Sequence, residues 1–330
     1  MRNQTLNEHT VRVTRTIEFS AAHFYRQDLM SETQNRAAFG ACFTPYGHGH
    51  NYRFEVLVEG VPNLSTGLLV ERPVFDTHLK KVVETLDHHH ANFDVPEFKA
   101  RVDGSPTLIP TTENLCLYLV NRLKQQLSSD ARFKMVGAKL FEMADLSVEW
   151  TDQDLDDAQA ETGEMSSALW MHEVSFRAVH RLAVAGCSDN ENLALFGHCS
   201  REHGHHYRLQ VTLQENPELV AAQKNKSGDL KTQPLIQRLI TQPEFEQILE
   251  SHVTKKYDGT NLNLVLPGSS QMAPQPTPQL TRQSTPHSTP EALLIRLFED
   301  LRVALQPHPS VCLAKLMLFD GENGSCEISI

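Results

Sequence analysis

Alternating apolar and polar positions mark the first two of four strands predicted in the first half of the chain. Residues 52–58 (YRFEVLV) alternate regularly and residues 11–19 alternate imperfectly, and both patterns predict strands. Residues 136–142 and 146–150 predict two closing strands. One pair of predicted strands therefore lies at the beginning of the first half, and a second pair lies at its end.

Two segments between these strands have helical spacing instead. Residues 74–86 and 112–127 carry apolar side chains three and four positions apart. The second segment opens with a Thr-Glu pair, which is typical of a helix N-terminus. The order strand, strand, helix, helix, strand, strand predicts an α+β fold with an antiparallel sheet and two helices on one face.

The second half of the chain repeats the motifs of the first. Residues 39–42 (FGAC) and 47–52 (GHGHNY) recur as 196–199 (FGHC) and 202–207 (EHGHHY). A histidine precedes the cysteine by 19 positions in both copies, at His23 and His180. Near the end of each copy, AKLFE at 138–142 matches AKLML at 314–318. Four matches in one order predict a tandem duplication in which both copies share one element order.

The duplication and the local composition divide the chain into domains. We expect a first domain at 1–150 and a second at 171–330. Residues 151–170 are acidic and poor in large apolar side chains, as in a linker. Residues 267–290 are rich in Pro, Ser, Thr and Gln and predict a long exposed loop inside the second domain.

The overall composition narrows the functional class. The chain has 330 residues, of which 40% are apolar and 22% charged, as expected for two ordinary globular domains. A net charge of −11 argues against a general nucleic-acid binder. No apolar run approaches the roughly 18 residues of a membrane span, and the N-terminus lacks the apolar core of a secretory signal. We therefore expect a cytoplasmic protein without a disulfide framework.

Clustered histidines indicate metal chemistry. His48 and His50 lie two apart, so in a strand both point to one face, and His23 from a neighbouring strand would complete a set of three. Three neutral imidazoles with an open position are typical of catalytic zinc. Cys42 is either a base activated beside the cation or a fourth ligand in a closed structural site. Surface or hydrogen-bonded core histidines are the plainer alternative.

At these residues the sequence resembles a known family. The motifs are F-S-A-A-H at 19–23, F-G-x-C-x5-H-G-H-N-Y at 39–52, L-D-H at 86–88, T-T-E-N at 111–114 and a late strand Glu142. In this order they resemble the 6-pyruvoyl-tetrahydropterin synthase / 6-carboxy-tetrahydropterin synthase family. The resemblance covers nearly all of residues 11–150 and, more weakly, 171–330.

The resemblance implies a fold and an assembly. Members have the tunnel fold (T-fold), in which sheets from several domains close into a barrel with helices outside and active sites between subunits. The family closes each barrel with three domains and stacks two barrels. Two domains per chain would then give a homo-oligomer, either a trimer of chains or a larger assembly.

The resemblance also implies roles for residues of the first copy. Zn²⁺ would be bound by His23, His48 and His50, and the substrate would be 7,8-dihydroneopterin triphosphate. Cys42 would be the general base, and Asp87 and His88 a second proton-transfer pair, although the run 88–90 is all histidine and a solvated turn is the alternative. Glu142 would anchor the pterin. A second pterin-contacting stretch would be formed by Thr111, Thr112 and Glu113, for which a helix cap is the alternative.

The second copy departs from the family pattern at two positions. It retains a thiol at Cys199 and possible zinc ligands at His180, His203 and His205. The Asp-His pair reads Asp258-Gly259, and Leu318 stands where the first copy has Glu142. By the same resemblance, Glu291 would be a remnant of the second contact stretch. We predict that this copy holds zinc, does not turn over the pterin alone, and supplies walls to the first copy's site or borrows His88.

Two lyase reactions fit the resemblance. One eliminates triphosphate to give 6-pyruvoyl-tetrahydropterin, and the other cleaves the side chain to 6-carboxy-tetrahydropterin and acetaldehyde. The five-residue gap between Cys42 and His48 resembles pyruvoyl-forming members, and the three-residue gap between Cys199 and His203 resembles carboxy-forming members. A non-catalytic, zinc-stabilised pterin-binding or assembly protein is the alternative of another class. A zinc hydrolase fits less well, because no carboxylate follows the H-G-H motif.

Overall fold

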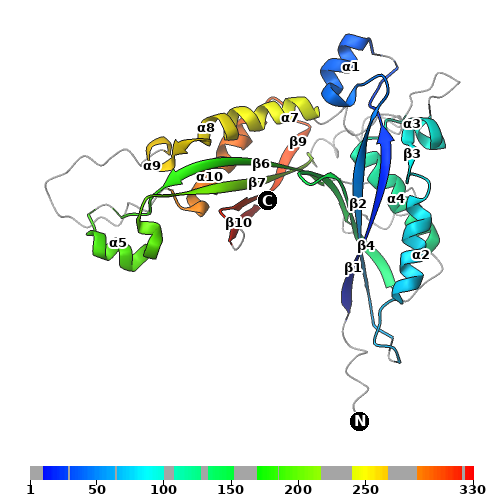
Figure 1. The fold of residues 1–330 in the computed structure, drawn as a ribbon, viewed down its shortest axis with the longest axis horizontal. Coiled ribbons are helices and arrows are strands. Elements are labelled where there is room, and N and C mark those ends of the chain that lie inside the picture. The colour runs from blue at the N-terminus through cyan, green and yellow to red at the C-terminus, as the bar shows by residue number, and fades with distance from the viewer. Residues whose placement is uncertain are drawn as a thin grey trace. The chain divides into compact units, whose positions relative to one another are not determined.

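The computed structural model describes residues 10–28, 30–63, 65–99, 108–127, 133–151, 169–184, 186–216, 240–266, 288–321 and 324–330. The chain divides into two compact units, which Figure 1 shows in blue-to-green and green-to-red colours. The first unit comprises residues up to 171 with 214–243, and the second comprises 172–213 with 244–330. Residues 152–168 of the predicted linker and 267–287 of the predicted loop lie outside the described residues.

The sheet of the first unit contains all four predicted strands. They are β1 (Val11–His23), β2 (His48–Gly60), β4 (Phe133–Met143) and β5 (Leu146–Thr151), joined antiparallel in the order β5-β4-β2-β1. A short strand, β3 (His89–His90), runs parallel to the end of β1. β1 and β2 are longer than predicted, because their ends pair with each other and place His23 opposite His48.

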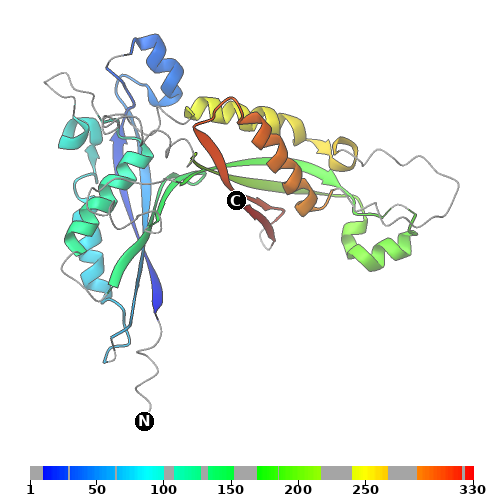
Figure 2. The same cartoon turned by 180° about the vertical axis from the view of Figure 1, so that it is seen from behind.

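Alternation along β2 decides which face of this sheet is covered. The side chains of Tyr52, Phe54, Val56 and Val58 have no accessible surface. They form one face, on which helices α2 (Arg72–Val83) and α4 (Thr112–Leu127) pack (Figures 1 and 2). The helix predicted at 112–127 is confirmed with the same bounds. The helix predicted at 74–86 begins and ends earlier, because residues 84–88 form the turn that leads into β3.

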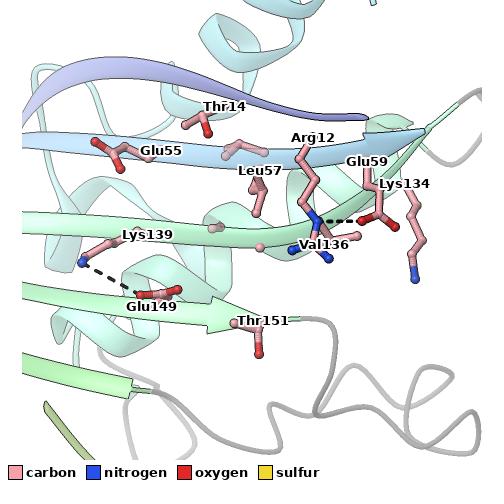
Figure 3. A pocket seen from close by; sticks show the side chains of 13 residues that line it. Arg12, Thr14, Glu55, Leu57, Glu59, Lys134, Val136, Lys139, Glu149 and Thr151 are labelled. Carbon is pink, nitrogen blue, oxygen red and sulfur yellow. Dashed lines mark hydrogen bonds and ion pairs between the residues drawn. The ribbon is translucent and has the colours of Figure 1, made fainter. Parts of the chain in front are cut away.

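The opposite face of the first sheet is polar. Figure 3 shows Arg12, Glu55, Glu59, Lys139 and Glu149 side by side on β1, β2, β4 and β5. Arg12 Nε lies 2.6 Å from Glu59 Oε2, and Lys139 Nζ lies 3.9 Å from Glu149 Oε2. This alternation of apolar and charged faces accounts for the period-two pattern from which the strands were predicted.

Several short helices of the first unit were not predicted. They are α1 (Glu32–Phe39), η2 (Gly40–Cys42), α3 (Ala91–Asp94) and η3 (Pro96–Phe98). α1 buries only Asn35 and Phe39, so its sequence carries no apolar stripe. Its N-terminus is fixed instead by a capping box, in which Ser31 and Gln34 bind each other's backbone N–H.

The second unit has a sheet with the corresponding strands. They are β6 (Leu169–His180), β7 (His203–Glu215), β9 (Val311–Phe319) and β10 (Ser325–Ser329), in the order β10-β9-β7-β6. β8 (Thr260–Asn261) runs parallel to β6 and pairs with Ala178 and Val179. Phe176 stacks on Tyr207 with ring centroids 5.1 Å apart, as Phe19 stacks on Tyr52 in the first unit.

Helices cover the second sheet as they cover the first. α7 (Gln242–Leu249), η8 (Glu250–Thr254) and α8 (Lys255–Tyr257) form one helical stretch, α9 (Leu262–Val265) follows β8, and α10 (Pro290–Ala304) precedes β9. Pro290, at the end of the predicted loop, is thus the first residue of a helix. No helix among the described residues is long and apolar enough to cross a membrane.

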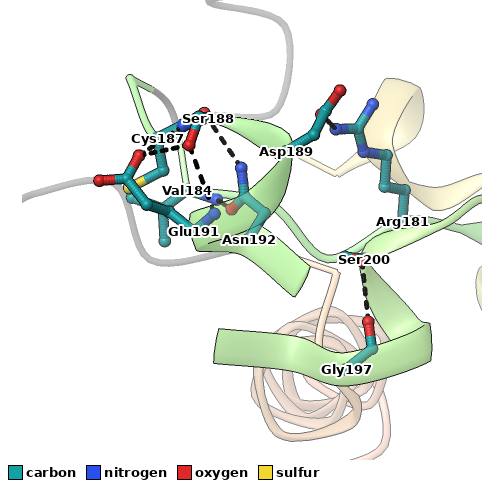
Figure 4. Close-up of polar contacts among 9 residues, drawn as sticks. All are labelled: Arg181, Val184, Cys187, Ser188, Asp189, Glu191, Asn192, Gly197 and Ser200. Carbon is teal, nitrogen blue, oxygen red and sulfur yellow. Dashed lines mark hydrogen bonds and ion pairs between the residues drawn. The ribbon is translucent and has the colours of Figure 1, made fainter. Parts of the chain in front are cut away.

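The thiol-bearing segment of the second unit is built like that of the first. α5 (Asp189–Phe196) begins with a capping box between Ser188 and Glu191 and leads into η5 (Gly197–Ser200) (Figure 4). The Asn192 side chain accepts from Val184 N–H and donates to Cys187 O. In the first unit, Asn35 makes the corresponding bonds to Gln27 and Met30.

Candidate metal and active site

Three histidines meet where β1 and β2 pair. His23 ends β1 opposite His48, the first residue of β2, and His50 lies two positions further on the same face. His23 Nε2 lies 3.1 Å from His48 Nε2, and the three ring centroids lie 4.6–5.1 Å apart. His23 Nδ1 donates to Pro110 O at 2.9 Å, which leaves Nε2 as the nitrogen with a free lone pair.

A glycine fixes the start of β2 beside this cluster. Gly47 has φ +79°, and a Cβ there would lie 2.6 Å from His90 Nε2 and 2.7 Å from His23 O. A side chain would therefore push the strand away from β1 and β3.

A buried carboxylate joins the three imidazoles. Glu142, on β4, has its Oε1 3.4 Å from His50 Nε2, and its Oε2 accepts hydrogen bonds from the hydroxyls of Thr112 and Tyr25. One donor atom from each histidine and from Glu142 can be chosen so that all lie within 4.8 Å of one another. The structure thus brings four potential metal ligands together from three strands.

Burial sets the protonation of this group. It lowers the pKa of His23 to about 3, assisted by His48 and His50, and lowers that of His50 to about 4. Burial also raises the pKa of Glu142 to about 7. The imidazoles are therefore neutral at physiological pH, which is the form that binds a metal ion.

The donor set fits a zinc ion. Donors about 2.0–2.1 Å from zinc at the corners of a tetrahedron lie about 3.3–3.4 Å apart. The separations of 3.1 Å between His23 and His48 and 3.4 Å between His50 and Glu142 are close to that edge. Among the described residues, His50 Nε2 is buried without a hydrogen-bond partner, which is costly unless a ligand occupies it.

Cys42 lies outside the group of four donors and is linked to it through Tyr25, whose ring lies against His23 and whose hydroxyl donates to Glu142. It ends η2, is 8% exposed, and packs with Tyr25, Phe39 and Ile109. Burial first, then the charges of Glu142 and Cys42, raise the pKa of Tyr25 and Tyr52 well above the usual range. This arrangement favours a thiol next to the metal site over a closed site of one cysteine and three histidines.

The predicted Asp-His pair lies in the turn before β3. Asp87 Oδ1 is 2.9 Å from His88 Nδ1 and accepts from Ser20 N–H at 3.0 Å. His88 has φ 59°, and its side chain is 81% exposed. His89 instead bonds the Asp87 carbonyl, and His90 packs against Phe93. Of the three consecutive histidines, His88 is therefore the one whose ring contacts the Asp87 carboxylate.

The stretch Thr111-Thr112-Glu113 lies at the start of α4 and next to Glu142. Thr111 accepts from Asn114 N–H and caps α4, whereas Thr112 turns inward and donates to Glu142. Glu113 is 4% exposed, burial raises its pKa, and among the described residues its Oε2 has no hydrogen-bond partner. A helix N-terminus thus presents two polar side chains next to Glu142.

The second unit forms a cluster of three histidines without a carboxylate. His180 Nε2 lies 3.1 Å from His203 Nε2, and potential ligand atoms of these two and His205 lie within 4.8 Å of one another. Each Nδ1 bonds a backbone carbonyl: His180 to Ser288, His203 to Arg201 and His205 to Asp320, at 2.6–2.7 Å. All three Nε2 atoms are thereby left for a ligand.

The remaining residues of the second unit differ from their counterparts. Leu318 is fully buried at the position of Glu142, and Gly259, with φ 71°, stands at the position of His88. Asp258 accepts two side-chain hydrogen bonds from Arg177, at 3.1 and 2.9 Å. Cys199 and Glu291 are exposed, whereas Cys42 and Glu113 are buried.

Sequence reasoning missed two side chains that shape these sites. The Tyr25 hydroxyl donates a hydrogen bond to Glu142, and the Arg177 guanidinium donates hydrogen bonds to the Asp258 carboxylate. A signal for Arg177 was present, because it stands three residues before His180 where Ser20 stands before His23. Tyr25 lies two residues beyond the end of β1, so no periodicity identifies it.

The fold and the paired histidine clusters define a duplicated α+β protein with one candidate metal centre per repeat. The model of the family "6-pyruvoyl tetrahydropterin synthase" matches the chain twice, over residues 12–153 and 170–329. The chain belongs to this family, and the resemblance inferred from the sequence is confirmed.

Similar proteins correspond in length to one repeat. A 6-pyruvoyl tetrahydrobiopterin synthase of Poecilia reticulata is 34% identical over 128 residues, which are 37% of this chain and 80% of that protein. The Homo sapiens protein of the same name is 32% identical over 124 residues, which are 37% of this chain and 81% of that protein. The structure of Caenorhabditis elegans 6-pyruvoyl tetrahydropterin synthase is 28% identical, covering 41% of this chain and 91% of that one, with a TM-score of 0.37.

Proposed function

We propose that the chain is a zinc-dependent pterin synthase that acts on 7,8-dihydroneopterin triphosphate through the site of its first unit. The observation that carries this proposal is the set of three neutral imidazoles and Glu142 beside Cys42, in a member of this family. The relatives named 6-pyruvoyl tetrahydrobiopterin synthase support the same class of substrate.

Each residue of the first site has a role in this proposal. His23, His48 and His50 hold the zinc, which when bound stabilises negative charge on side-chain oxygens of the substrate. Cys42 takes a proton from the substrate's side-chain carbon. Glu142 accepts N–H groups of the pterin, with Thr111, Thr112 and Glu113 lining the same place.

Asp87 and His88 form the second proton-transfer pair. The Asp87 carboxylate faces His88 Nδ1, which fixes the ring and leaves Nε2 to exchange a proton with the substrate. The 81% exposure of the His88 side chain suits a site that a neighbouring domain completes. We therefore also propose a T-fold barrel closed by a homo-oligomer of two-domain chains, with the polar sheet face of Figure 3 turned inward.

The second unit supports this chemistry without performing it. It retains three histidines and Cys199, but Gly259 and Leu318 provide neither an imidazole nor a pterin-binding carboxylate. Its zinc therefore stabilises the fold or the assembly in this proposal. The domains follow as 1–150, a linker at 151–170, and 171–330.

We propose 6-pyruvoyl-tetrahydropterin and triphosphate as the products, because the five-residue gap between Cys42 and His48 resembles pyruvoyl-forming members. The three-residue gap between Cys199 and His203 favours 6-carboxy-tetrahydropterin and acetaldehyde as the second candidate. Zinc-loaded protein incubated with 7,8-dihydroneopterin triphosphate, followed by mass analysis, separates the two. Pterin binding without turnover would support the non-catalytic alternative and reject this proposal.

A further inference from the structure

The two oxygens of Glu142 face different neighbours. Oε2 accepts hydrogen bonds from the hydroxyls of Thr112 and Tyr25. Because Thr112 is the first residue of α4, these bonds hold the Glu142 side chain on the face of the sheet that the helices cover. Oε1 lies 3.4 Å from His50 Nε2, on the side of the three imidazoles. Since only 2% of the side chain is exposed, water does not take the place of these contacts.

Glu142 can contribute a fourth donor atom within 4.8 Å of the three imidazole donors. Tetrahedral zinc sites place their donors about 3.3–3.4 Å apart, and the distance from Oε1 to His50 Nε2 has this value. His50 Nε2 itself is buried without a hydrogen-bond partner among the described residues, so an ion between the two atoms would satisfy both. The first unit thus offers three neutral donors and one carboxylate.

The described residues of the second unit provide no such fourth donor. Leu318 is fully buried at the corresponding place on β9, and the three imidazoles of His180, His203 and His205 have no carboxylate within the group. Their Nδ1 atoms are all held by backbone carbonyls, so the ring orientations are fixed without Glu142. One chain therefore has one histidine cluster with a carboxylate among its donors and one cluster of histidines alone.

We infer that Glu142 caps the metal of the first unit while no pterin is bound. When a pterin binds, Glu142 accepts its N–H groups and releases the metal, so the vacated position takes a side-chain oxygen of the substrate. In the second unit, His180, His203 and His205 would hold the metal without a fourth protein donor from the described residues. The pterin step rests on the proposed function, whereas the capping of the metal by Glu142 does not.

Cobalt replaces zinc in such sites, and its visible spectrum reports coordination without any turnover. His203→Ala leaves only the first site, and His48→Ala leaves only the second. Azide is the probe for an open position. We expect azide to shift the spectrum of the second site at once, and to shift that of the first site only after 6-methyl-7,8-dihydropterin, which carries no triphosphate side chain, is added.

Glu142→Gln in the His203→Ala background tests the carboxylate itself. We expect the first site to respond to azide without pterin and to bind Co²⁺ about 10-fold or more weakly, since even outer-sphere partners contribute 10- to 100-fold. Glu149→Gln, which removes a carboxylate on the neighbouring strand β5 that pairs with Lys139 and lies outside the donor group, is the control and should leave the azide response unchanged. If Glu142→Gln does not fold, Glu142→Asp shortens the carboxylate and should give the same response.

The outcomes separate the two proposals. A first site that takes azide as readily as the second, or an unchanged azide response in Glu142→Gln, overturns the capping role. Capping without an effect of the pterin overturns the release step. The two sites can also differ in their azide response while the protein does not turn over 7,8-dihydroneopterin triphosphate. That result supports the capping role of Glu142 and rejects the proposed enzymatic function.

Discussion

At the scale of single residues, the two copies differ most in the surroundings of the same side chains. Cys42 is buried among Tyr25, Phe39 and Ile109, whereas Cys199 is exposed. Glu142 meets the imidazoles of its unit, whereas Leu318 cannot. A retained residue type is therefore no guarantee of a retained role.

The two cysteines provide a direct test of this asymmetry. We expect Cys42→Ser to reduce kcat by about 10²–10⁴-fold, the range for loss of a general base. Cys199→Ser should change kcat less than about 2-fold, because its unit lacks the imidazole and the pterin carboxylate. Steady-state kinetics with 7,8-dihydroneopterin triphosphate measure both. Equal losses would contradict the division of labour between the units.

Arg177 should control the ionisation of Asp258. Its side-chain and backbone hydrogen bonds lower the pKa of that carboxyl to about 2. Since the folded pKa lies below the unfolded value of about 3.9, the pair stabilises the fold above pH 4, and this contribution is lost as the pH falls through about 2. Arg177→Gln should raise the pKa of Asp258 toward its ordinary value in an NMR titration. Arg181→Gln, which removes the partner of Asp189, is the control and should not.

At the scale of elements, each thiol is positioned by a short capped helix. α1 and α5 carry little apolar surface and begin with the capping boxes Ser31–Gln34 and Ser188–Glu191. Both lead within one turn into the segment with the cysteine. The capping hydrogen bonds therefore take the place of a buried stripe in fixing these helices.

Removal of either cap should destabilise its own unit. We expect Ser31→Ala and Ser188→Ala each to lower the free energy of unfolding of the affected unit by about 1 kcal/mol, measured by denaturant titration. Ser31→Ala should also lower activity, because α1 ends at the turn that holds Cys42, and Ser188→Ala should not. An activity loss confined to Ser188→Ala would assign the working thiol to the other unit.

At the scale of the whole molecule, the duplication gives one chain two candidate metal sites with different donor sets. The first has three imidazoles and a carboxylate, and the second has three imidazoles. A metal that binds the folded state stabilises it by mass action. Each unit should therefore depend on its own metal for part of its stability.

Metal content and metal removal check this dependence. We expect two zinc ions per chain in the purified protein, and one in each of His48→Ala and His203→Ala. A chelator should lower the melting temperature of the wild-type chain. In each variant the chelator should lower the melting temperature by less, because the unit that carries the substitution no longer binds a metal. One zinc per wild-type chain, retained in His203→Ala, would show that the second cluster binds none.

Most of the fold was predictable, because it rests on regular patterns within single elements. Period-two alternation identified β1 and β2, β4 and β5 were predicted as closing strands, and helical spacing identified α4 with the same bounds. α1 was missed because a capped polar helix has no apolar stripe, and β3 because two residues are too few for a pattern.

The sequence by itself determined the duplication, the family and the three histidines of each cluster, since repeated motifs and an H-x-H on one strand are local features. Only the tertiary structure decided that Glu142 meets His50, that His88 rather than His89 or His90 faces the Asp87 carboxylate, and that Arg177 occupies Asp258. Periodicity reports which side chains share a face of one element. Contacts between elements depend on strand register and packing, which no short stretch of sequence contains.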